Sequence, residues 1–382
     1  MNALGMMSGT SMDGIDLAII KTNGLLHIEF GPTDFMPYDP AFREQIRACL
    51  GQTQMTPELK ALSIDITRKH MEFLGHFLAK RNMKPSELDV IGFHGQTITH
   101  IPEKKFSLQV GNGAMITNVT GVPVVDNFRR MDIASGGQGA PLASLYHSAL
   151  VSRPGGVLKP AAVLNIGGVA NVTWIGEPKK DEDEEDIGLG GGPVDIEENL
   201  LAFDTGPGNA LLDDWVMKTT GKPMDEGGKL AMTGKVNTAV LGKLLDNPFF
   251  KKKPPKSLDR NAFSLDLLDG LSPEDGAATL TAFTVESVVR AEAMLPAPPR
   301  NWVITGGGRK NEAMLKILGF KLKGKVRTAE DVHWNGDALE AQAFAFLAVR
   351  SLYGLHLSVP STTGVKQAIT GGTLHKKGKP ED

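Results

Sequence analysis

Apolar residues near the start of the chain form short runs separated by small polar ones. The runs 4–7 and 15–21 flank the segment Ser8-Gly9-Thr10-Ser11-Met12-Asp13-Gly14. Short apolar runs bounded by turn residues indicate strands. The pattern therefore predicts a strand, a tight turn and a returning strand. A further run, 90–93, predicts a strand that ends at Phe93, with the polar segment His94-Gly95-Gln96-Thr97 just beyond its carboxyl end. Ligands of α/β folds usually bind beyond such ends.

Helical spacing follows two residues that are typical N-caps. Thr56 and Pro57 precede apolar residues at mostly helical intervals up to Phe77. Threonine favours the N-cap and proline the first turn, so a helix is predicted to begin there and to pack one face on a sheet. Asn311 is predicted to cap a second helix, which carries Met314, Leu315 and Leu318.

The second half of the chain repeats the strand, turn, strand pattern. The runs 162–166 and 172–175 flank Gly167-Gly168, the run 200–203 precedes Asp204-Thr205-Gly206-Pro207-Gly208-Asn209, and the run 302–305 precedes Gly306-Gly307-Gly308-Arg309. Three predicted strands thus end in glycine-rich loops. This weak internal repetition favours two lobes of related architecture over one continuously wound sheet.

The length of 382 residues agrees with two domains. We predict an α/β fold with one lobe made of residues 1–130 plus 350–382 and a second lobe made of residues 131–349. The charged run 179–186 and the glycines of 188–192 interrupt the second lobe. Such a segment buries little apolar surface, so it is interpreted as a mobile surface insertion.

Composition narrows the class of ligand. The chain is 41% hydrophobic and 22% charged with a net charge of −3, so no basic surface for nucleic acid or an anionic membrane is indicated. Residues 1–9 lack the pattern of a secretory signal, which predicts a cytoplasmic protein. The single cysteine, Cys49, excludes an intrachain disulfide and is interpreted as a core residue. The nine histidines show no ligand spacing, so any metal is expected to arrive with a nucleotide.

The glycine-rich turns suit phosphate groups. Glycine lets backbone N–H groups approach a phosphate closely, and hydroxyl groups add directed donors. The turn 8–14 has both, although many ordinary turns have the same composition. Neither a P-loop nor a Gly-x-Gly-x-x-Gly pattern follows the first strand. Phosphate binding therefore rests on the whole set: the first turn, the segment 204–209 and the late glycine loop 306–308.

The order of these three loops resembles the actin, Hsp70 and sugar-kinase superfamily. Finer motifs resemble the anhydro-N-acetylmuramic acid kinase family over nearly the whole chain. They are Gly5-Met6-Met7-Ser8-Gly9-Thr10-Ser11-Met12-Asp13-Gly14-Ile15-Asp16, Phe93-His94-Gly95-Gln96-Thr97, Asn127-Phe128-Arg129-Arg130-Met131-Asp132-Ile133-Ala134, Asn165-Ile166-Gly167-Gly168 and Phe203-Asp204-Thr205-Gly206-Pro207-Gly208-Asn209.

The resemblance implies a two-lobed actin-like (ribonuclease H-like) fold, with mixed sheets flanked by helices and an interlobe cleft. It implies a kinase that uses ATP and Mg²⁺ on a small-molecule sugar, opens the 1,6-anhydro bridge with water and phosphorylates O6. Such a reaction belongs to peptidoglycan recycling and amino sugar metabolism. It also implies a homodimer.

Site residues follow from the same motifs. Asp204 matches the family's catalytic base, although an aspartate at this position also suits a turn cap. The implied nucleotide-binding residues are Gly9, Thr10, Ser11, Met12, Asp13, Gly14, Ile15, Asp16, Gly206, Gly208, Asn209, Gly306, Gly307 and Gly308. The implied sugar-binding residues are Thr97, Arg130, Asp132 and Glu340, and the lactyl carboxylate of the sugar suits a guanidinium.

Several alternatives stay open. Asp13 either positions magnesium through water or caps its turn. Glu340 either binds sugar or forms a capping box with Asp337. The protein could be a kinase of another sugar or of a carboxylate on the same fold, or a non-catalytic nucleotide switch that hydrolyses ATP slowly without a sugar.

Overall fold

The structure is a computed structural model that describes residues 1–9, 11–177, 196–260 and 262–377. The chain forms two compact units. The first unit contains Met1–Pro154 and the segment from Asp337 onward, and the second contains Gly155–Gly336. These boundaries differ from the predicted positions near residues 130 and 350. The difference at the later boundary arises because a late helix, α11 (Leu339–Leu352), packs against the first strands of the chain and so belongs to the first unit.

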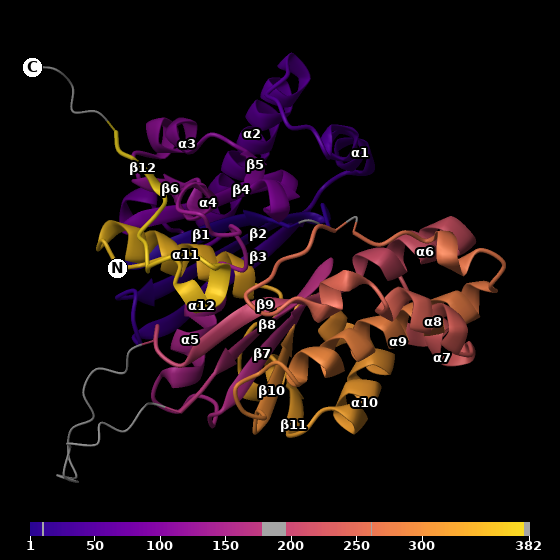
Figure 1. The fold of residues 1–382 in the computed structure, drawn as a ribbon. Helices are drawn as coiled ribbons and strands as arrows, with labels where there is room; N and C mark the ends of the chain where they lie inside the picture. The colour runs from indigo at the N-terminus through magenta and orange to yellow at the C-terminus, as the bar shows by residue number, and fades with distance from the viewer. Residues whose placement is uncertain (10, 178–195, 261, 378–382) are drawn as a thin grey trace, which may run out of the picture. The chain divides into compact units, whose positions relative to one another are not determined.

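The first unit is built on a mixed sheet of seven strands (Figure 1). Its order is β12-β6-β4-β1-β2-β3, and β5 pairs with β4. Strand β1 is antiparallel to β2 and parallel to β4, which is parallel to β6. The strands are β1 Asn2–Ser8, β2 Gly14–Thr22, β3 Ile28–Pro37, β4 Val90–Ile101, β5 Phe106–Val110, β6 Val124–Asp126 and β12 Thr373–His375.

Helices cover both faces of this sheet. Leu4 and Met6 alternate along β1 and join a core with residues of α1 and α2. Gly5 points to the opposite face, where α11 lies. The other helices of this unit are α1 Pro40–Cys49, α2 Pro57–Ala79, α3 Gly113–Thr120, α4 Phe128–Ala134, α5 Ser144–Ser152 and α12 Pro360–Thr363, with short 3₁₀ turns at Pro85–Glu87 and Pro102–Lys104.

Two glycines allow α11 to lie directly on the sheet. A Cβ atom on Gly5 would stand 1.7 Å from the carbonyl oxygen of Ala341, and one on Gly92 would stand 2.1 Å from that of Phe344. Heavy atoms cannot approach so closely, so only glycine fits at these positions of β1 and β4. The helix is buried along most of its length. It therefore forms an integral layer of the first unit (Figure 1).

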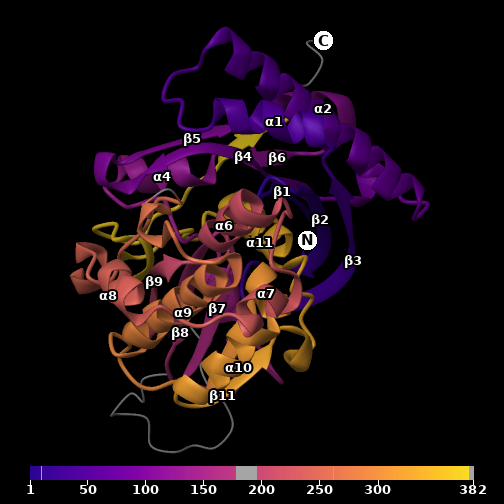
Figure 2. The same cartoon turned by 90° about the vertical axis from the view of Figure 1, so that its right-hand side faces the viewer.

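The second unit is built on a five-stranded sheet of order β11-β10-β7-β8-β9. Strands β7 and β10 are parallel, β8 is antiparallel to β7, and β9 is antiparallel to β8. Helices α9 and α10 lie on one face of this sheet (Figure 2). The strands are β7 Ala161–Ile166, β8 Val169–Ile175, β9 Leu200–Pro207, β10 Asn301–Thr305 and β11 Lys325–Thr328.

The core of the second unit lies between the sheet and its helices. It contains Leu164 and Ile166 of β7 together with Trp215 of α6 and Phe283 of α9. The helices are α6 Ala210–Thr220, α7 Lys229–Thr233, α8 Thr238–Leu245, α9 Pro273–Glu292 and α10 Glu312–Lys321, with 3₁₀ turns at Glu226–Gly228, Pro248–Lys251, Asp266–Leu268, Gly307–Lys310 and Glu330–Val332.

The two sheets share a strand order. In the first unit the order β3-β2-β1-β4-β6 has the same directions as β9-β8-β7-β10-β11 in the second. Each begins with a hairpin, adds a third antiparallel strand, and continues with two strands parallel to the first. The predicted repetition and the predicted α/β fold with mixed sheets are confirmed.

Helix starts were predicted well, but two strand ends were not. The side chains of Thr56 and Asn311 cap α2 and α10 by accepting from Leu59 and Met314 N–H groups. Strand β4 does not end at Phe93 and β9 does not end at Phe203. Both continue because β5 pairs with the second half of β4 and because β8 pairs with β9 as far as Pro207. His94–Thr97 and Asp204–Gly206 are therefore strand residues.

Three smaller observations complete the fold. Cys49 is buried and free, as predicted for a core residue. Most of the predicted acidic insertion, residues 178–195, lies outside the described part of the chain. Among the described helices, none is both long and apolar enough to cross a membrane.

Candidate active site

The first glycine-rich turn joins β1 to β2 at the carboxyl end of β1, beside the middle of β4. The Gln96 side chain of β4 connects the two strands, because its Oε1 accepts from the Ser8 hydroxyl at 2.6 Å and its Nε2 donates to the Gly9 carbonyl at 3.1 Å. The Met12 N–H donates to the Gly9 carbonyl at 3.0 Å and closes the turn. The predicted hairpin is thus present, with Gln96 as a support that the sequence motif did not assign.

The predicted nucleotide-binding residues of this turn differ in the solvent exposure of their side chains. Ser11 and Asp13 are exposed, and the Ser11 hydroxyl donates to Asp13 Oδ1 at 2.6 Å. Met12 and Ile15 are buried in the core of the first unit, so a ligand could meet only their backbone. Gly14 is required by packing, since a Cβ there would stand 2.2 Å from the Met36 carbonyl oxygen.

The last predicted residue of this segment, Asp16, is partly buried on β2. Thr10 lies outside the described residues, and its predicted role stays a prediction.

The four predicted sugar contacts also lie in the first unit, on three different elements. Thr97 is partly buried on β4, and its hydroxyl accepts from Gln109 Nε2 at 3.5 Å. Arg130 is exposed on α4. Glu340 is partly buried in the first turn of α11. The helix begins at Leu339 with Ala338 as N-cap and without a side-chain cap, so the capping box proposed for Asp337 and Glu340 is wrong.

Asp132 has a clear role within the protein. Its side chain is buried, and its carboxylate accepts from the Gly139 N–H at 2.6 Å and from the Thr363 hydroxyl. These bonds join α4 to the following loop and to α12. Asp132 therefore organises the surroundings of Arg130, whatever else it contacts.

Next to it, Arg129 holds a buried histidine in place. The Arg129 Nε and Nη2 atoms lie 3.3 and 3.2 Å from His94 Nε2, and Arg129 Nη1 donates to the Gly139 carbonyl at 2.6 Å. Burial, with the nearby Arg129 charge, lowers the pKa of His94 to about 3. His94 is therefore neutral at physiological pH. The motif contained both residues, but their contact depends on the fold.

In the second unit, three predicted loops meet at one edge of the sheet. Strands β7, β9 and β10 run in the same direction, so their carboxyl ends lie at the same edge, and the β7–β8 turn lies there too. This arrangement brings the segment 204–209 and the loop 306–308 to the Gly167-Gly168 turn. Ligands of open α/β sheets bind beyond such an edge.

The Gly208 segment interlocks with the Gly167 turn. The Gly208 N–H donates to the Gly168 carbonyl at 3.0 Å, and the Asn209 N–H donates to the Gly167 carbonyl at 2.7 Å. The Thr284 hydroxyl of α9 donates to the Gly208 carbonyl at 3.2 Å. Asn209 Nδ2 donates to the Ile166 carbonyl at 3.0 Å. The predicted residues of this segment thus form one connected backbone surface.

The late glycine loop is held by a buried arginine. Arg309 donates from Nη1 to the Gly306 carbonyl at 2.9 Å and from Nε to Glu330 Oε1 at 2.9 Å. Gly306 has a φ of 71°, and a Cβ there would stand 2.4 Å from Asn165 Oδ1. A Cβ on Gly308 would stand 2.4 Å from Ile166 Cγ2, whereas one on Gly307 would stand 3.2 Å from Asn209 Nδ2. Gly306 and Gly308 are therefore fixed by packing on the β7 end.

Asp204 is the buried carboxylate of this edge. Its side chain is 6% exposed on β9, and its Oδ2 accepts from the Leu258 N–H at 2.7 Å. The Asp204 N–H donates to the Lys256 carbonyl at 2.8 Å. A buried carboxylate with a fixed orientation is suited to take a proton from a reacting group. Residues 256–258 therefore belong to the candidate site, and sequence analysis missed them because none of the motifs covers this segment.

Asp213 on α6 is a carboxyl group with a strongly raised pKa. Burial raises the pKa of Asp213 to about 7, with the Asp214 charge adding to the effect and Arg260 opposing it. Asp213 lies one turn after Asn209, and its N–H donates to the Asn209 carbonyl at 2.8 Å. Perturbed carboxyl groups often lie near functional sites.

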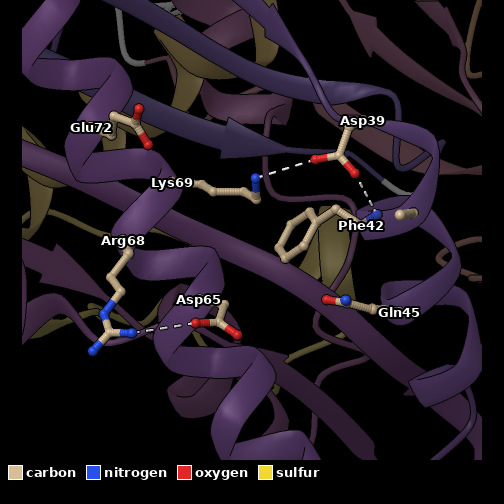
Figure 3. Close-up of a pocket in the computed structure, with 8 residues that line it drawn as sticks. Asp39, Phe42, Gln45, Asp65, Arg68, Lys69 and Glu72 are labelled. Carbon is tan, nitrogen blue, oxygen red and sulfur yellow. Dashed lines mark hydrogen bonds and ion pairs between the residues drawn. The ribbon is translucent and has the colours of Figure 1, made fainter.

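The first unit also has a pocket that is not formed by the glycine-rich loops. It is an opening of about 310 Å³ between α1 and α2 in the first unit (Figure 3). Four of its charged residues form two ion pairs: Lys69 Nζ lies 3.4 Å from Asp39 Oδ2, and Arg68 Nη1 lies 3.6 Å from Asp65 Oδ1. None of its lining residues is a predicted site residue; they are Asp39, Ala41, Phe42, Gln45, Asp65, Arg68, Lys69 and Glu72.

The repeated sheet order, with glycine turns where parallel strands end, defines an α/β protein of the actin-like ATPase class. Within that class the chain can be placed further. The sequence model of anhydro-N-acetylmuramic acid kinase matches residues 1–377. The chain belongs to this family, whose members are kinases that transfer a phosphoryl group to an alcohol.

Relatives of the same name cover the chain almost completely. An anhydro-N-acetylmuramic acid kinase of Rhodospirillum rubrum is 48% identical over 373 residues, which are 97% of this chain and 93% of the relative. One of Rhizorhabdus wittichii is 46% identical over 98% of this chain and 99% of its own. One of Paramagnetospirillum magneticum is 45% identical over the same two shares.

Solved structures with a similar arrangement are more distant. The activator of the 2-hydroxyisocaproyl-CoA dehydratase from Clostridium difficile, with bound ADPNP, superposes with a TM-score of 0.46 at 12% identity, covering 92% of this chain and 96% of the other. A xylulose kinase from Lactobacillus acidophilus gives a TM-score of 0.44 at 12% identity, with coverage of 98% and 93%.

Proposed function

We propose that the protein is an ATP-dependent kinase that opens the 1,6-anhydro ring of anhydro-N-acetylmuramic acid with water and phosphorylates O6. The products are N-acetylmuramate 6-phosphate and ADP, and the reaction serves peptidoglycan recycling. The observation that carries this proposal is the buried Asp204 carboxylate, held by the Leu258 N–H at the edge where three glycine turns gather. Family membership selects the sugar.

The chemistry requires two coupled substitutions, one at C1 of the sugar and one at the γ-phosphorus of ATP. Water attacks C1 and gives its proton to the Asp204 carboxylate, a new C1–O bond forms, and the C1–O6 bond breaks. The released O6 attacks the γ-phosphorus of ATP, and the bond from that phosphorus to the β–γ bridging oxygen breaks, which releases ADP. Asp204 is suited to the first step because its second oxygen is anchored by the protein, which fixes the plane of the carboxylate.

The nucleotide is assigned to the glycine turns. In the second unit the Gly206–Asn209 segment and the Gly306–Gly308 loop lie at one sheet edge. The Gly208 and Asn209 N–H groups donate to the Gly168 and Gly167 carbonyls, so Gly208 offers a phosphate close approach to the backbone and not a free N–H donor. In the first unit the exposed Ser11 and Asp13 side chains lie on the β1–β2 turn. Mg²⁺ keeps several waters and needs few protein carboxylates when phosphates are present, so Asp13 fits the role of a carboxylate that positions it through water.

The sugar is assigned to Thr97, Arg130, Asp132 and Glu340. Arg130 is exposed and offers a guanidinium to a carboxylate such as the lactyl group. Asp132 already accepts two hydrogen bonds from the protein. We therefore propose that, besides contacting the sugar, it holds the part of α4 that carries Arg130 in position. We also propose that the protein is cytoplasmic and forms a homodimer, on the basis of family membership alone.

The test measures ADP release by purified protein with ATP, magnesium and 1,6-anhydro-N-acetylmuramic acid, against N-acetylglucosamine, glucose, acetate and no acceptor. We expect release only with the anhydro sugar, and one heavy oxygen at C1 of the product when the water is labelled. ADP release with another acceptor would show that the protein is a kinase with a different substrate. Release without any acceptor would replace the kinase by a nucleotide switch.

A further inference from the structure

A buried lysine lies in the segment whose backbone holds Asp204. Lys256 is 4% exposed, although the three lysines that precede it, Lys251 to Lys253, are all exposed. Its backbone carbonyl accepts from the Asp204 N–H at 2.8 Å, and two residues later the Leu258 N–H donates to Asp204 Oδ2 at 2.7 Å. The backbone of 256–258 thus holds Asp204 at two points.

The Lys256 ammonium is surrounded by groups that favour a positive charge. Its Nζ donates to the Phe249 carbonyl at 3.2 Å and lies 4.4 Å from the centre of the Phe249 ring and 5.8 Å from that of Phe203. The faces of aromatic rings attract cations. Phe203 precedes Asp204 on β9, so the strand that carries the carboxylate also supplies a ring face to this lysine.

Charges around Lys256 act in opposite directions. Burial lowers the pKa of Lys256 to about 8, the Asp204 carboxylate opposes this effect, and the nearby Lys252 cation adds to it. A buried ammonium is costly unless an anion compensates it. Asp204 is the anion that compensates it here. The interaction is reciprocal, because the same attraction favours the ionised form of the carboxylate.

We propose that Lys256 is a positioning residue for the hydrolytic step: its ammonium keeps the Asp204 carboxylate ionised for the attacking water, while the backbone of 256–258 fixes its orientation. The inference rests on the proposed function, in which Asp204 is the general base. Only an ionised carboxylate can accept the proton of water, so loss of the cation restricts activity at low pH.

The experiment measures kcat/KM for the anhydro sugar between pH 5 and 9.5 at saturating ATP and magnesium, for the wild type and for Lys256→Met, Lys256→Arg and Lys253→Met. For Lys256→Met we expect the acidic limb to move to higher pH by about one unit, since the loss of a nearby opposite charge shifts a carboxyl pKa by this order. Lys256→Arg keeps the cation and should keep the acidic limb. Lys253→Met removes an exposed charge from the same segment and should change neither limb.

A second variant keeps the proposal testable if Lys256→Met does not fold. Lys256→Gln removes the charge but keeps a side chain that can donate towards the Phe249 carbonyl. It should therefore move the acidic limb of kcat/KM to higher pH, as Lys256→Met does. An unmoved acidic limb in a folded Lys256→Met or a folded Lys256→Gln would overturn the role of Lys256.

Failure of the proposed function gives different results. A wild-type protein without turnover on the anhydro sugar would refute the assigned substrate before any variant is compared. Wild-type turnover in Asp204→Asn would refute Asp204 as the base. A role of Lys256 in folding alone would lower kcat at every pH by a constant factor and leave both limbs in place, which would refute only the positioning role.

Discussion

The carbonyl oxygen of Gly167 lies 2.2 Å from the position that a Cβ atom of Gly208 would take. The two turns of the second unit are thus packed backbone against backbone, with no room for the smallest side chain. Because the neighbouring Asn209 N–H donates to this same carbonyl, the contact aligns the segment after Asp204 with the β7–β8 turn.

Gly208→Ala is therefore expected to separate the two turns. The backbone contact must lengthen, and overpacking of this kind costs roughly 1 to 3 kcal/mol of the free energy of unfolding. Urea unfolding measures the loss. Gly242→Ala in α8 is the matched control, because a Cβ there would meet nothing within 4 Å and alanine favours a helix. A stability of Gly208→Ala equal to that of Gly242→Ala would contradict the packing argument.

Asp204→Asn should retain ATP binding but lose turnover on the anhydro sugar. An amide can still accept from the Leu258 N–H but cannot take a proton from water, and a general base contributes about 10² to 10⁴ in rate. Steady-state kinetics gives kcat, and calorimetry gives the ATP affinity. Asp269→Asn, which removes a surface carboxylate paired with Lys218, is the control. Unchanged kcat would remove Asp204 from the mechanism.

Arg309→Lys is expected to weaken nucleotide binding more than sugar binding. A lysine cannot donate in two directions with the fixed geometry of a guanidinium, so the link from Gly306 to Glu330 is lost. We expect the KM for ATP to rise by about tenfold, equivalent to about 1.4 kcal/mol, and the KM for the sugar to stay within a factor of two. Lys316→Met, on the exposed side of α10, should change neither value. A rise in the KM for the sugar alone would contradict the assignment of the loop to nucleotide.

His70 is expected to make the protein sensitive to acid. Burial lowers its pKa to about 4, so the folded state binds fewer protons than the unfolded state once the pH falls below the ordinary value near 6.5. The stabilisation present above pH 6.5 is lost as the pH falls towards 4, by roughly 3 kcal/mol for this group.

The corresponding test uses His70→Leu, which places an apolar side chain in the same buried position of α2. Its free energy of unfolding should fall less than that of the wild type between pH 6.5 and 4. His76→Leu, at an exposed position on the same helix, should follow the wild type. Parallel curves for all three proteins would show that His70 does not titrate as its burial requires.

Asp213 is expected to lower the stability of the protein as the pH rises, whereas His70 lowers it as the pH falls. Because its pKa is raised to about 7, the folded state binds more protons than the unfolded state between pH 4 and 7. Its contribution to stability is present below pH 4 and is lost as the pH rises to 7. Asp213→Asn should gain roughly 1 to 3 kcal/mol over the wild type on going from pH 4 to pH 8. Unfolding at several pH values measures this difference, and Asp214→Asn, at an exposed position, should show less of it.

Local signals along the chain predicted much of the fold. Glycine, hydroxyl and proline residues act within a few positions, so the hairpin turns and the caps at Thr56 and Asn311 could be inferred directly. Strand ends depend on partners. Asp204 lies inside β9 because β8 continues to pair beside it, and no residue near 204 carries that information.

The site was predicted in the same uneven way. Motifs selected Asp204 and the glycine loops, but the contacts that hold them come from residues distant in sequence, such as Thr284 and Glu330. Lys256 and Leu258 lie more than 50 positions after Asp204 in a segment rich in lysine and proline, a composition typical of exposed turns. Their burial follows from the path of the chain, which composition does not report.

The placement of α11 on Gly5 and Gly92 also determines the order in which the protein can be completed during synthesis. The second unit is one continuous stretch of chain, whereas the first needs both ends. At a synthesis rate of about 5 to 20 residues per second, strands β1 and β4 wait roughly 10 to 70 seconds for the helix that covers them. We expect a nascent chain that stops before Asp337 to contain a folded second unit and a first-unit sheet with one uncovered face.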